Sequence, residues 1–448
     1  MSNEALFRRV LIVTSSYSPT TIADLHRARH LAWELPELGW TVEILCPNRE
    51  FQREEYFELN SESFFSPTTV VHAVAPVANR LFHLLKVGGI GWRSLLPIYR
   101  KGSELLKTGR FDVVYFSTAN FVLFTLGAFW RKKYTIPYVL DFHDPWVRVS
   151  TKYRTTKHPI KQWIGSFLSK TMERRSVENA AGVVSVSPIY ISHLRKRYTA
   201  SASLRANRSM AIPFAARRQD LEIQSTGSKH SNHFLINYVG AGGSIMAKSF
   251  SAICASLAEL RKSDPAPFQR LRIRLYGTYA YWKPGDPTPL RDIATTFGLD
   301  DVVEEYPARV TYRRSLELIL ESDGLFVLGV DDQGYMPSKL FPYALSGKPL
   351  LGSFRSDSPP VDYFARLPEL GHLLTFPAVG PTPKPGQEDI ATVGKFLKEA
   401  SCRTQFDRLK ILEPYLAPAM ARRHADLFDQ IVASCELRAL SALATLRS

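Results

Sequence analysis

The sequence has 448 residues, of which 45% are apolar and 22% are charged, and its formal net charge is +15. This length predicts two or three domains, and this composition excludes a disordered chain. The excess of Lys and Arg favours anionic partners, such as nucleotide phosphates or an acidic membrane surface.

The excess positive charge is concentrated in two stretches of the N-terminal half. Residues 79–110 hold seven Lys or Arg against the single acid Glu104, and residues 148–175 hold eight against Glu173. Aromatic residues are interleaved with the basic ones, which suits contact with an anionic membrane surface. A solvated basic face is the alternative interpretation.

Cysteine usage and the apolar runs restrict the compartment. The four cysteines are far apart and form no CxxC or Cys/His ligand pattern; they are Cys46, Cys254, Cys402 and Cys435. A structural zinc site or disulfide framework is therefore not expected, and a reducing compartment fits. Residues 1–13 lack a signal-peptide pattern, and the longest apolar run, residues 121–130, is half a membrane span. We expect a cytoplasmic protein that does not cross the membrane.

Short apolar runs alternate with helical patterns along the first half of the chain. Residues 10–14 indicate a buried parallel strand, because the run is continuously apolar rather than alternating. A helix follows, and Gly39 ends it. The apolar face of that helix comprises Ala28, Leu31, Ala32, Leu35 and Leu38. Further strands are expected at residues 41–45, 112–116, 138–142 and 182–186.

A polar stretch, residues 217–231, interrupts this rhythm and predicts a linker between two domains. The rhythm then restarts, with strands expected at residues 234–239, 271–276, 324–328 and 349–352 and a helix around residues 250–261. The tail, residues 418–437, has a helical apolar stripe of Met420, His424, Leu427, Phe428 and Ile431. Strands that alternate with helices predict two α/β halves, each with a parallel sheet covered by helices.

Ligands of parallel α/β sheets bind at the carboxyl ends of the strands, so we expect the binding residues in the loops that follow the strands. The first loop, residues 14–24, has small hydroxyl side chains and no glycine. It therefore lacks the GxGxxG fingerprint, and NAD binding is disfavoured. Such a loop either approaches an anionic ligand or simply caps the helix that follows.

A second loop, residues 141–146, places Asp141, His143 and Asp144 at the end of a hydrophobic strand. Two carboxylates and an imidazole within four residues predict binding or chemistry, for example a hydrogen bond to a sugar hydroxyl or the orientation of an acceptor. Alternatively, the aspartates cap the next segment and His143 lies on the surface.

Two loops of the second half suit a phosphate. Gly240 and Gly242 follow a strand, with Lys248 close behind; glycines let a backbone approach phosphate oxygens, and a lysine adds charge. The spacing is not that of a Walker motif, so a plain tight turn is the alternative. Further on, Ser338 is predicted to cap a helix whose first turn presents backbone amides and Lys339 to a phosphate.

Six segments, in the right order, resemble the family 4 glycosyltransferases, in particular a bacterial group with a DFRDPW-like segment. They are residues 10–47, with "elGW-V" at the second strand; 141–146, with His143 where arginine is usual; 178–187, like "vSvS"; 238–243, like "YaGt-"; 316–323, like the helix before "aD-ll"; and 336–351, like "iPSKlfEYla-GkPil". The resemblance implies a GT-B fold, in which two Rossmann-like domains with parallel sheets face an interdomain cleft. It implies a domain of residues 1–216, completed by a C-terminal helix at 414–448 that crosses back, and a donor-binding domain of residues 217–413.

The resemblance also implies an activity. A sugar would move, with retention of configuration, from a nucleotide diphosphate sugar to an acceptor hydroxyl. The acceptor would be a glycan or a lipid-linked saccharide in bacterial envelope polysaccharide synthesis, with no cofactor and no obligatory metal. The catalytic candidates are Asp141, His143 and Asp144, and the donor-binding candidates are Gly240, Gly242, Lys248, Arg309, Ser338, Lys339 and Tyr343.

The chain departs from the family pattern at two positions. Pro342 replaces the glutamate that usually binds the donor ribose, and Gly334 replaces the partner glutamate eight residues earlier. Contacts to the ribose must then come from elsewhere. Two alternatives therefore stay open: a non-catalytic GT-B binding or scaffold protein, and a nucleotide-sugar 2-epimerase. A nucleic-acid-binding protein is suggested by charge alone, and no recognisable module supports it.

Overall fold

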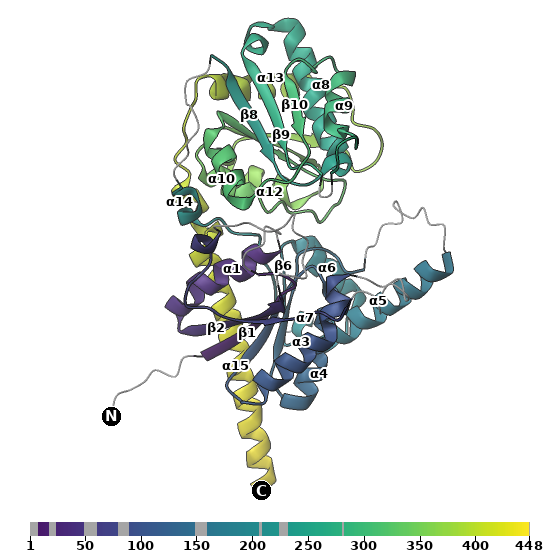
Figure 1. Ribbon diagram of the computed structural model, residues 1–448, viewed down its shortest axis with the longest axis vertical. Helices are drawn as coiled ribbons and strands as arrows, with labels where there is room; N and C mark the ends of the chain where they lie inside the picture. Colours follow the sequence, from purple (N-terminus) through teal and green to yellow (C-terminus); the bar gives the residue numbers. More distant parts are fainter. Residues whose placement is uncertain are drawn as a thin grey trace. The chain divides into compact units, whose positions relative to one another are not determined.

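The protein folds into two compact units, each with its own parallel sheet (Figure 1). Met1–Pro213 and Ala417–Ser448 form the first unit, and Phe214–Leu416 form the second. The computed structural model describes residues 8–17, 24–48, 61–78, 89–147, 159–205, 208–223, 232–279 and 282–447.

The first unit contains a seven-stranded sheet with the order β3-β2-β1-β4-β5-β6-β7. Every neighbouring pair is parallel. All five residues of β4 are buried, as the continuous apolar run predicts for a strand with helices on both faces. The strands are β1 (Arg8–Val13), β2 (Trp40–Pro47), β3 (Val70–Val74), β4 (Val113–Ser117), β5 (Tyr138–Phe142), β6 (Gly182–Ser185) and β7 (Ser209–Ala211).

Helices cover the faces of this sheet. The first ends in a 3-10 turn, Leu35–Leu38, and Gly39 follows with a left-handed φ of 80°, so the predicted stop at this glycine is confirmed. None of the described helices is both long enough and apolar enough to span a bilayer. The helices of the first unit are α1 (Leu25–Glu34), α3 (Ile90–Leu106), α4 (Thr125–Tyr134), α5 (Pro159–Asn179), α6 (Pro188–Arg197), α7 (Ala202–Arg205) and α15 (Ala417–Arg447).

The last helix, α15, packs on the first unit beside α1 although it follows the whole second unit in the sequence (Figure 1). The Phe428 ring meets the rings of Trp40 and Tyr115 edge-on, each with centroids 5.4 Å apart. His424 reaches the hydroxyl of Tyr115, with 3.0 Å between Nε2 and the oxygen. The apolar stripe predicted for the tail is therefore the contact surface of α15.

The second unit repeats the design with a six-stranded parallel sheet of order β10-β9-β8-β11-β12-β13. Numbered from its own first strand, each sheet contains the order 3-2-1-4-5-6 of a Rossmann fold, whose strand order reverses between the first and fourth strands. These switch points lie between β1 and β4 and between β8 and β11. The strands are β8 (Phe234–Val239), β9 (Leu271–Tyr276), β10 (Val303–Tyr306), β11 (Gly324–Leu328), β12 (Leu350–Arg355) and β13 (His372–Phe376).

The helices of the second unit complete its own apolar core, in which residues such as Phe250, Leu275 and Phe396 are fully buried. Part of the predicted linker, residues 224–231, lies outside the described residues. The helices are α8 (Ala247–Ser263), α9 (Pro289–Thr296), α10 (Tyr312–Glu321), α11 (Leu340–Leu345), α12 (Pro359–Arg366), α13 (Gln387–Ser401) and α14 (Leu409–Leu412). The predicted α/β fold with two parallel sheets is confirmed.

Candidate functional site

Small hydroxyl side chains line the carboxyl edge of the first sheet at its switch point. The hydroxyls of Ser15 and Ser16 donate to the Asp24 carboxylate at 2.9 and 3.2 Å, and the Ala119 amide donates to it at 3.4 Å. Asp24 is buried at the start of α1. It therefore ties together the loops that follow β1 and β4. The remainder of the first predicted loop, residues 18–23, lies outside the described residues.

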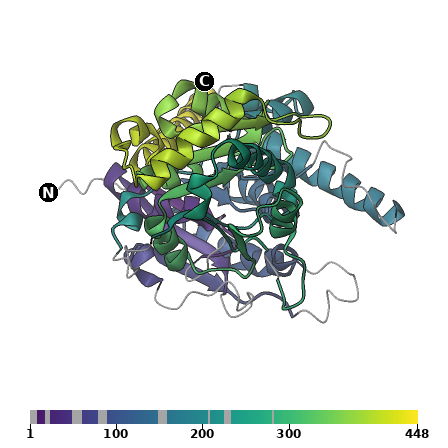
Figure 2. The same ribbon diagram turned by 90° about the horizontal axis from the view of Figure 1, so that it is seen from above.

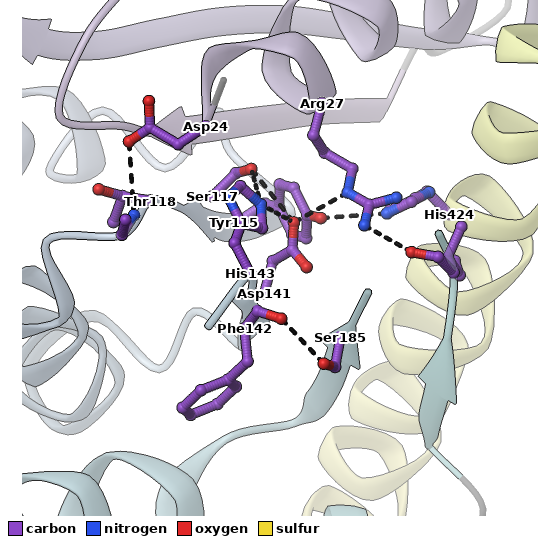
Figure 3. Close-up of polar contacts among 12 residues, drawn as sticks. Asp24, Arg27, Tyr115, Ser117, Thr118, Asp141, Phe142, His143, Ser185 and His424 are labelled. Carbon is purple, nitrogen blue, oxygen red and sulfur yellow. Dashed lines mark hydrogen bonds and ion pairs between the residues drawn. The ribbon is translucent and has the colours of Figure 1, made fainter. Parts of the chain in front are cut away.

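Asp141, at the end of β5, is fully buried in a polar network (Figure 3). Its Oδ2 accepts a hydrogen bond from Arg27 Nε at 2.9 Å and lies 2.7 Å from His143 Nε2. The Ser117 hydroxyl donates to the same oxygen at 3.2 Å. Burial raises the pKa of Asp141, but the positive charge of Arg27 and the contact with His143 together lower it by more. The pKa of Asp141 therefore lies well below its ordinary value. The carboxylate is charged, and it can act on a ligand only through the groups around it.

The two other residues of this loop lie nearer the surface. His143 is 7% exposed, and its Nε2 is 3.2 Å from the Ser117 hydroxyl oxygen. Asp144 is exposed. The Trp146 ring stacks on Phe121, with centroids 5.8 Å apart, and so fixes the end of the loop. The loop thus turns one carboxylate inward and the other outward.

In the second unit, Lys339 lies directly over Gly240 at the carboxyl end of β8. Gly240 has a φ of 149°, and a Cβ on it would overlap Cε and Nζ of Lys339. Lys339 Nζ is also 5.4 Å from the centroid of the Tyr238 ring, within the range of a cation–π contact. Only glycine lets the lysine side chain lie this close to the backbone.

Lys339 has no carboxylate partner among the described residues. Its side chain makes no ion pair or hydrogen bond with any residue in the described part of the chain. Burial, and then the positive charge of Arg309, lower the pKa of Lys339 from 10.5 to about 8. Arg309 comes from the loop after β10 and is partly buried. Two cations held near each other beside a glycine make a site suited to an anion.

Lys248, by contrast, is paired within the protein. Its Nζ is 3.0 Å from Asp331 Oδ2, and Arg355 lies 3.4 Å from the other oxygen of the same carboxylate. Arg355 in turn makes a 2.6 Å ion pair with Asp357. The structure therefore groups Lys339, Gly240 and Arg309 as three of the predicted donor contacts and gives Lys248 a carboxylate partner of its own.

The prediction that Ser338 caps a helix is wrong. The helix α11 begins at Leu340, and its N-cap is Lys339, which has helical dihedral angles and no side-chain capping bond. A capping residue usually has extended dihedral angles, whereas Lys339, which occupies the N-cap position, has helical ones. Tyr343 is buried, and its hydroxyl donates to the Val239 carbonyl at 2.8 Å and accepts from the Val239 amide at 3.0 Å. This contact joins α11 to the end of β8.

The remaining residues of the predicted site have backbone roles. The Gly242 amide donates to the Thr278 carbonyl at 3.1 Å and so joins the loops after β8 and β9. The Gly334 amide donates to Asp332 Oδ1 at 2.7 Å, and Pro342 lies partly buried inside α11. Among the described residues, no group of three or more His, Cys, Asp or Glu is placed to hold a metal ion.

Comparison with known proteins connects the site to a family. Residues 26–205 match the Glycosyltransferase Family 4 family, a span that contains Arg27, Asp141 and His143. None of the curated proteins matches the chain in sequence. HepE of Anabaena, in a complex with UDP and glucose, is similar in structure, with 14% sequence identity and a TM-score of 0.57 over 94% of this chain and 100% of that one. The match covers residues 26–205 of the first unit, and the structural likeness gives the chain the GT-B fold.

Two other solved structures share the fold of this chain. The UDP-forming trehalose-phosphate synthase of Burkholderia vietnamiensis has 10% identity and a TM-score of 0.55, over 96% of this chain and 99% of that one. The N-terminal domain of trehalose-6-phosphate phosphatase of Candida albicans has 11% identity and a TM-score of 0.56, over 94% and 96% of the two chains. At these identities the likeness establishes the GT-B fold alone.

Sequence patterns missed several residues of the candidate site. Arg27 is fully buried and also donates to the carbonyl groups of Ile212 and Pro213, at 2.6 and 3.2 Å. Arginine is rarely buried, so its place on the apolar side of α1 carried no signal. Ser117 could have been found, because it ends a predicted strand next to β5.

Proposed function

We propose that the second unit binds the pyrophosphate of a nucleotide-sugar donor at Lys339, Gly240 and Arg309. One observation carries this proposal: Lys339 is held against a glycine backbone and beside an arginine, without a carboxylate partner among the described residues. A pyrophosphate offers several oxygens to such a group of cations. The complex of HepE with UDP and glucose makes UDP-glucose the first donor to test.

In the proposed reaction, the bond between the anomeric carbon and the diphosphate oxygen breaks, and the acceptor oxygen bonds to the same face of that carbon. The acceptor proton passes to the departing diphosphate. Negative charge grows on the leaving phosphate, and the positive charges of Lys339 and Arg309 stabilise it. Attack on the face that the leaving group occupied retains the configuration.

The acceptor is proposed to meet the first unit. The His143 ring is the member of this network nearest the surface and can hydrogen-bond a sugar hydroxyl, and Asp141 and Ser117 hold His143 in place. We propose a glycan or lipid-linked saccharide of bacterial envelope polysaccharide synthesis as the acceptor. Such an acceptor agrees with a place on the inner face of the cell membrane.

Calorimetry with UDP, GDP, ADP and TDP tests the donor site. We expect UDP to bind, and Lys339→Ala to weaken its affinity by about ten- to a hundredfold, because a hydrogen bond to a charged group contributes about 1.5–3 kcal/mol. Lys395→Ala is the matched control, since Lys395 is an exposed lysine of α13 in the same unit. Equal affinity of the Lys339→Ala variant and the wild type would remove Lys339 from the site.

Product analysis tests the transfer. With an α-linked donor and a sugar acceptor, retention predicts an α-linked product in the proton NMR spectrum. A β-linked product would contradict the proposed attack on the same face, and an epimerised donor formed without any acceptor would favour an epimerase.

One feature favours a second function, a non-catalytic GT-B binding or scaffold protein. Gly334 and Pro342 stand where the family has the two glutamates, so the ribose lacks its usual contacts. That function predicts weak or no UDP binding and no turnover of any UDP-sugar. Release of UDP from a UDP-sugar in the presence of acceptor distinguishes the two.

A further inference from the structure

The N-terminal half of α5 presents large apolar side chains to solvent. Trp163 is 68% exposed, Ile164 47%, Phe167 59% and Leu168 44%. Burying such residues is favourable, and a contiguous exposed group of them marks an interaction site. We call these four residues the α5 apolar face.

The four residues share one side of the helix. Their spacing of one and four residues spans a continuous sector of an α-helix, and the small residues Gly165, Ser166 and Ser169 occupy the opposite side. The Trp163 and Phe167 rings stack with centroids 6.0 Å apart and form a flat apolar surface. Figures 1 and 2 show that this end of α5 extends away from the rest of the first unit.

The other half of α5 is fixed to the unit. Glu173 is fully buried, and its carboxylate accepts hydrogen bonds from the Tyr198 hydroxyl at 2.5 Å and from Arg197 at 3.1 Å. Val177 is fully buried in the core. A helix anchored in this way holds its exposed half in a defined place.

The sequence that leads into this half of α5 selects the occupant by its charge. Residues 148–162 of the sequence contain five Lys or Arg and no Asp or Glu; they are Arg148, Lys152, Arg154, Lys157 and Lys161. Lys170 is exposed on the helix itself. A second copy of the chain would bring the same basic segment against itself, because a two-fold interface pairs like with like. An anionic lipid surface attracts the lysines and arginines and accepts the aromatic rings.

We propose that the α5 apolar face inserts into the headgroup region of a bilayer that contains anionic lipids. The helix then lies on the membrane without crossing it, and it holds the first unit at the surface where a lipid-linked acceptor is found. The inference rests on the α5 surface, and donor binding at Lys339 is independent of it.

Co-sedimentation of the full-length protein with lipid vesicles tests the proposal. We expect binding to vesicles with about one quarter phosphatidylglycerol, weaker binding to pure phosphatidylcholine, and weakening in about 0.5 M salt. Trp163→Ser/Phe167→Ser should reduce binding at least about tenfold. Leu437→Ser/Leu440→Ser is the matched control, because these two residues of α15 are 66% and 63% exposed, and it should bind like the wild type.

A conservative variant, Trp163→Phe, provides a second test that does not require weaker binding. Brominated acyl chains should quench part of the tryptophan fluorescence of the wild type, and Trp163→Phe should bind equally while losing that part. The proposal is overturned if the double serine variant binds vesicles like the wild type, or if Trp163→Phe leaves the quenching unchanged. It is also overturned if the double serine variant converts a dimer to a monomer without any vesicle effect. Unchanged UDP affinity in these variants separates the result from the donor site.

Discussion

Lys339 and Lys248 illustrate how surroundings distinguish two residues of the same type. Both follow strands of the second sheet and both suit a phosphate on sequence grounds. The structure gives Lys248 the carboxylate of Asp331 at 3.0 Å and gives Lys339 the ring of Tyr238 and the charge of Arg309. A lysine without a carboxylate partner among the described residues keeps its affinity for an incoming anion, so Lys339 is the stronger candidate for the proposed donor contact.

The lowered pKa of Lys339 predicts that nucleotide affinity depends on pH. In the proposed donor site the ammonium form of Lys339 binds the pyrophosphate, and burial lowers the pKa of Lys339 to about 8. Below that pH the lysine is already charged and affinity is constant, whereas above it binding must also take up a proton. Affinity should therefore fall as the pH rises, approaching about tenfold per unit above pH 8.

Calorimetry between about pH 7 and about pH 9 measures this dependence. Lys339→Arg is the matched control, because arginine stays charged throughout the range and its affinity should hardly change. A wild-type affinity that is flat across this range would show that Lys339 is not the titrating contact.

Arg27 and Asp141 form a buried ion pair whose disruption should destabilise the first unit. Arg27→Met leaves the Asp141 carboxylate buried without its guanidinium, and removal of one partner of such a pair costs about 3–5 kcal/mol. Arg27→Met/Asp141→Leu should cost less than the sum of the two single changes, because no buried charge is left alone.

Urea unfolding followed by tryptophan fluorescence measures these effects. Of the seven tryptophans, all but Trp282 belong to the first unit, so the signal reports on that unit. Additive effects in the double variant would mean that the two charges do not depend on each other.

At the scale of elements, the interior strands were predictable and the edge strands were not. The apolar runs predicted nine strands, and these are the interior strands of the two sheets. The missed strands are β3, β7, β10 and β13, the two edges of each sheet. An edge strand has one neighbour and is less buried, so it needs no continuous apolar run; Val70 of β3 is 51% exposed.

The residues of the candidate site likewise divide into those that the sequence predicted and those that it did not. Loops after interior strands were predictable, because their position follows from the strands and their residue types are unusual. Contacts between residues far apart in the sequence were not predictable. Arg27, for example, donates to Asp141, which lies 114 residues further along the chain. The helix start at Leu340 was also missed, because the dihedral angles of Lys339 depend on packing that the sequence does not display.

The turn after β8 predicts different outcomes for two neighbouring glycines. Gly240→Ala places a Cβ where Lys339 lies and strains a φ of 149°, so the lysine must move. UDP affinity should fall at least about tenfold, with a stability loss of about 1–3 kcal/mol. Gly242→Ala meets only the flexible Met246 side chain, and it should leave UDP affinity nearly unchanged.

Calorimetry gives the affinities, and thermal unfolding gives the stabilities. If Gly240→Ala and Gly242→Ala weaken UDP equally, the close approach of Lys339 to Gly240 is not what the nucleotide uses.

At the scale of the whole molecule, the chain enters and leaves the second unit at one place. The Ala216 amide donates to the Tyr415 carbonyl at 3.0 Å, and Ala216 pairs with Leu416 as an isolated parallel bridge. The chain then continues into α15, which completes the first unit. The first unit is therefore completed by a helix, α15, that follows the whole second unit in the sequence. Each unit has an apolar core of its own.

This arrangement predicts that α15 stabilises the first unit without affecting donor binding in the second. Phe428 is fully buried against Trp40 and Tyr115, so Phe428→Ala should cost about 3–5 kcal/mol, the usual effect of removing a buried phenylalanine ring. Leu437→Ala, at a 66% exposed position of the same helix, should cost less than about 0.5 kcal/mol. Urea unfolding by tryptophan fluorescence measures both, and calorimetry below the transition should find wild-type UDP affinity in each variant. A loss of UDP affinity in Phe428→Ala while the first unit is still folded would show that donor binding depends on α15, because the second unit makes no use of Phe428 in its own core.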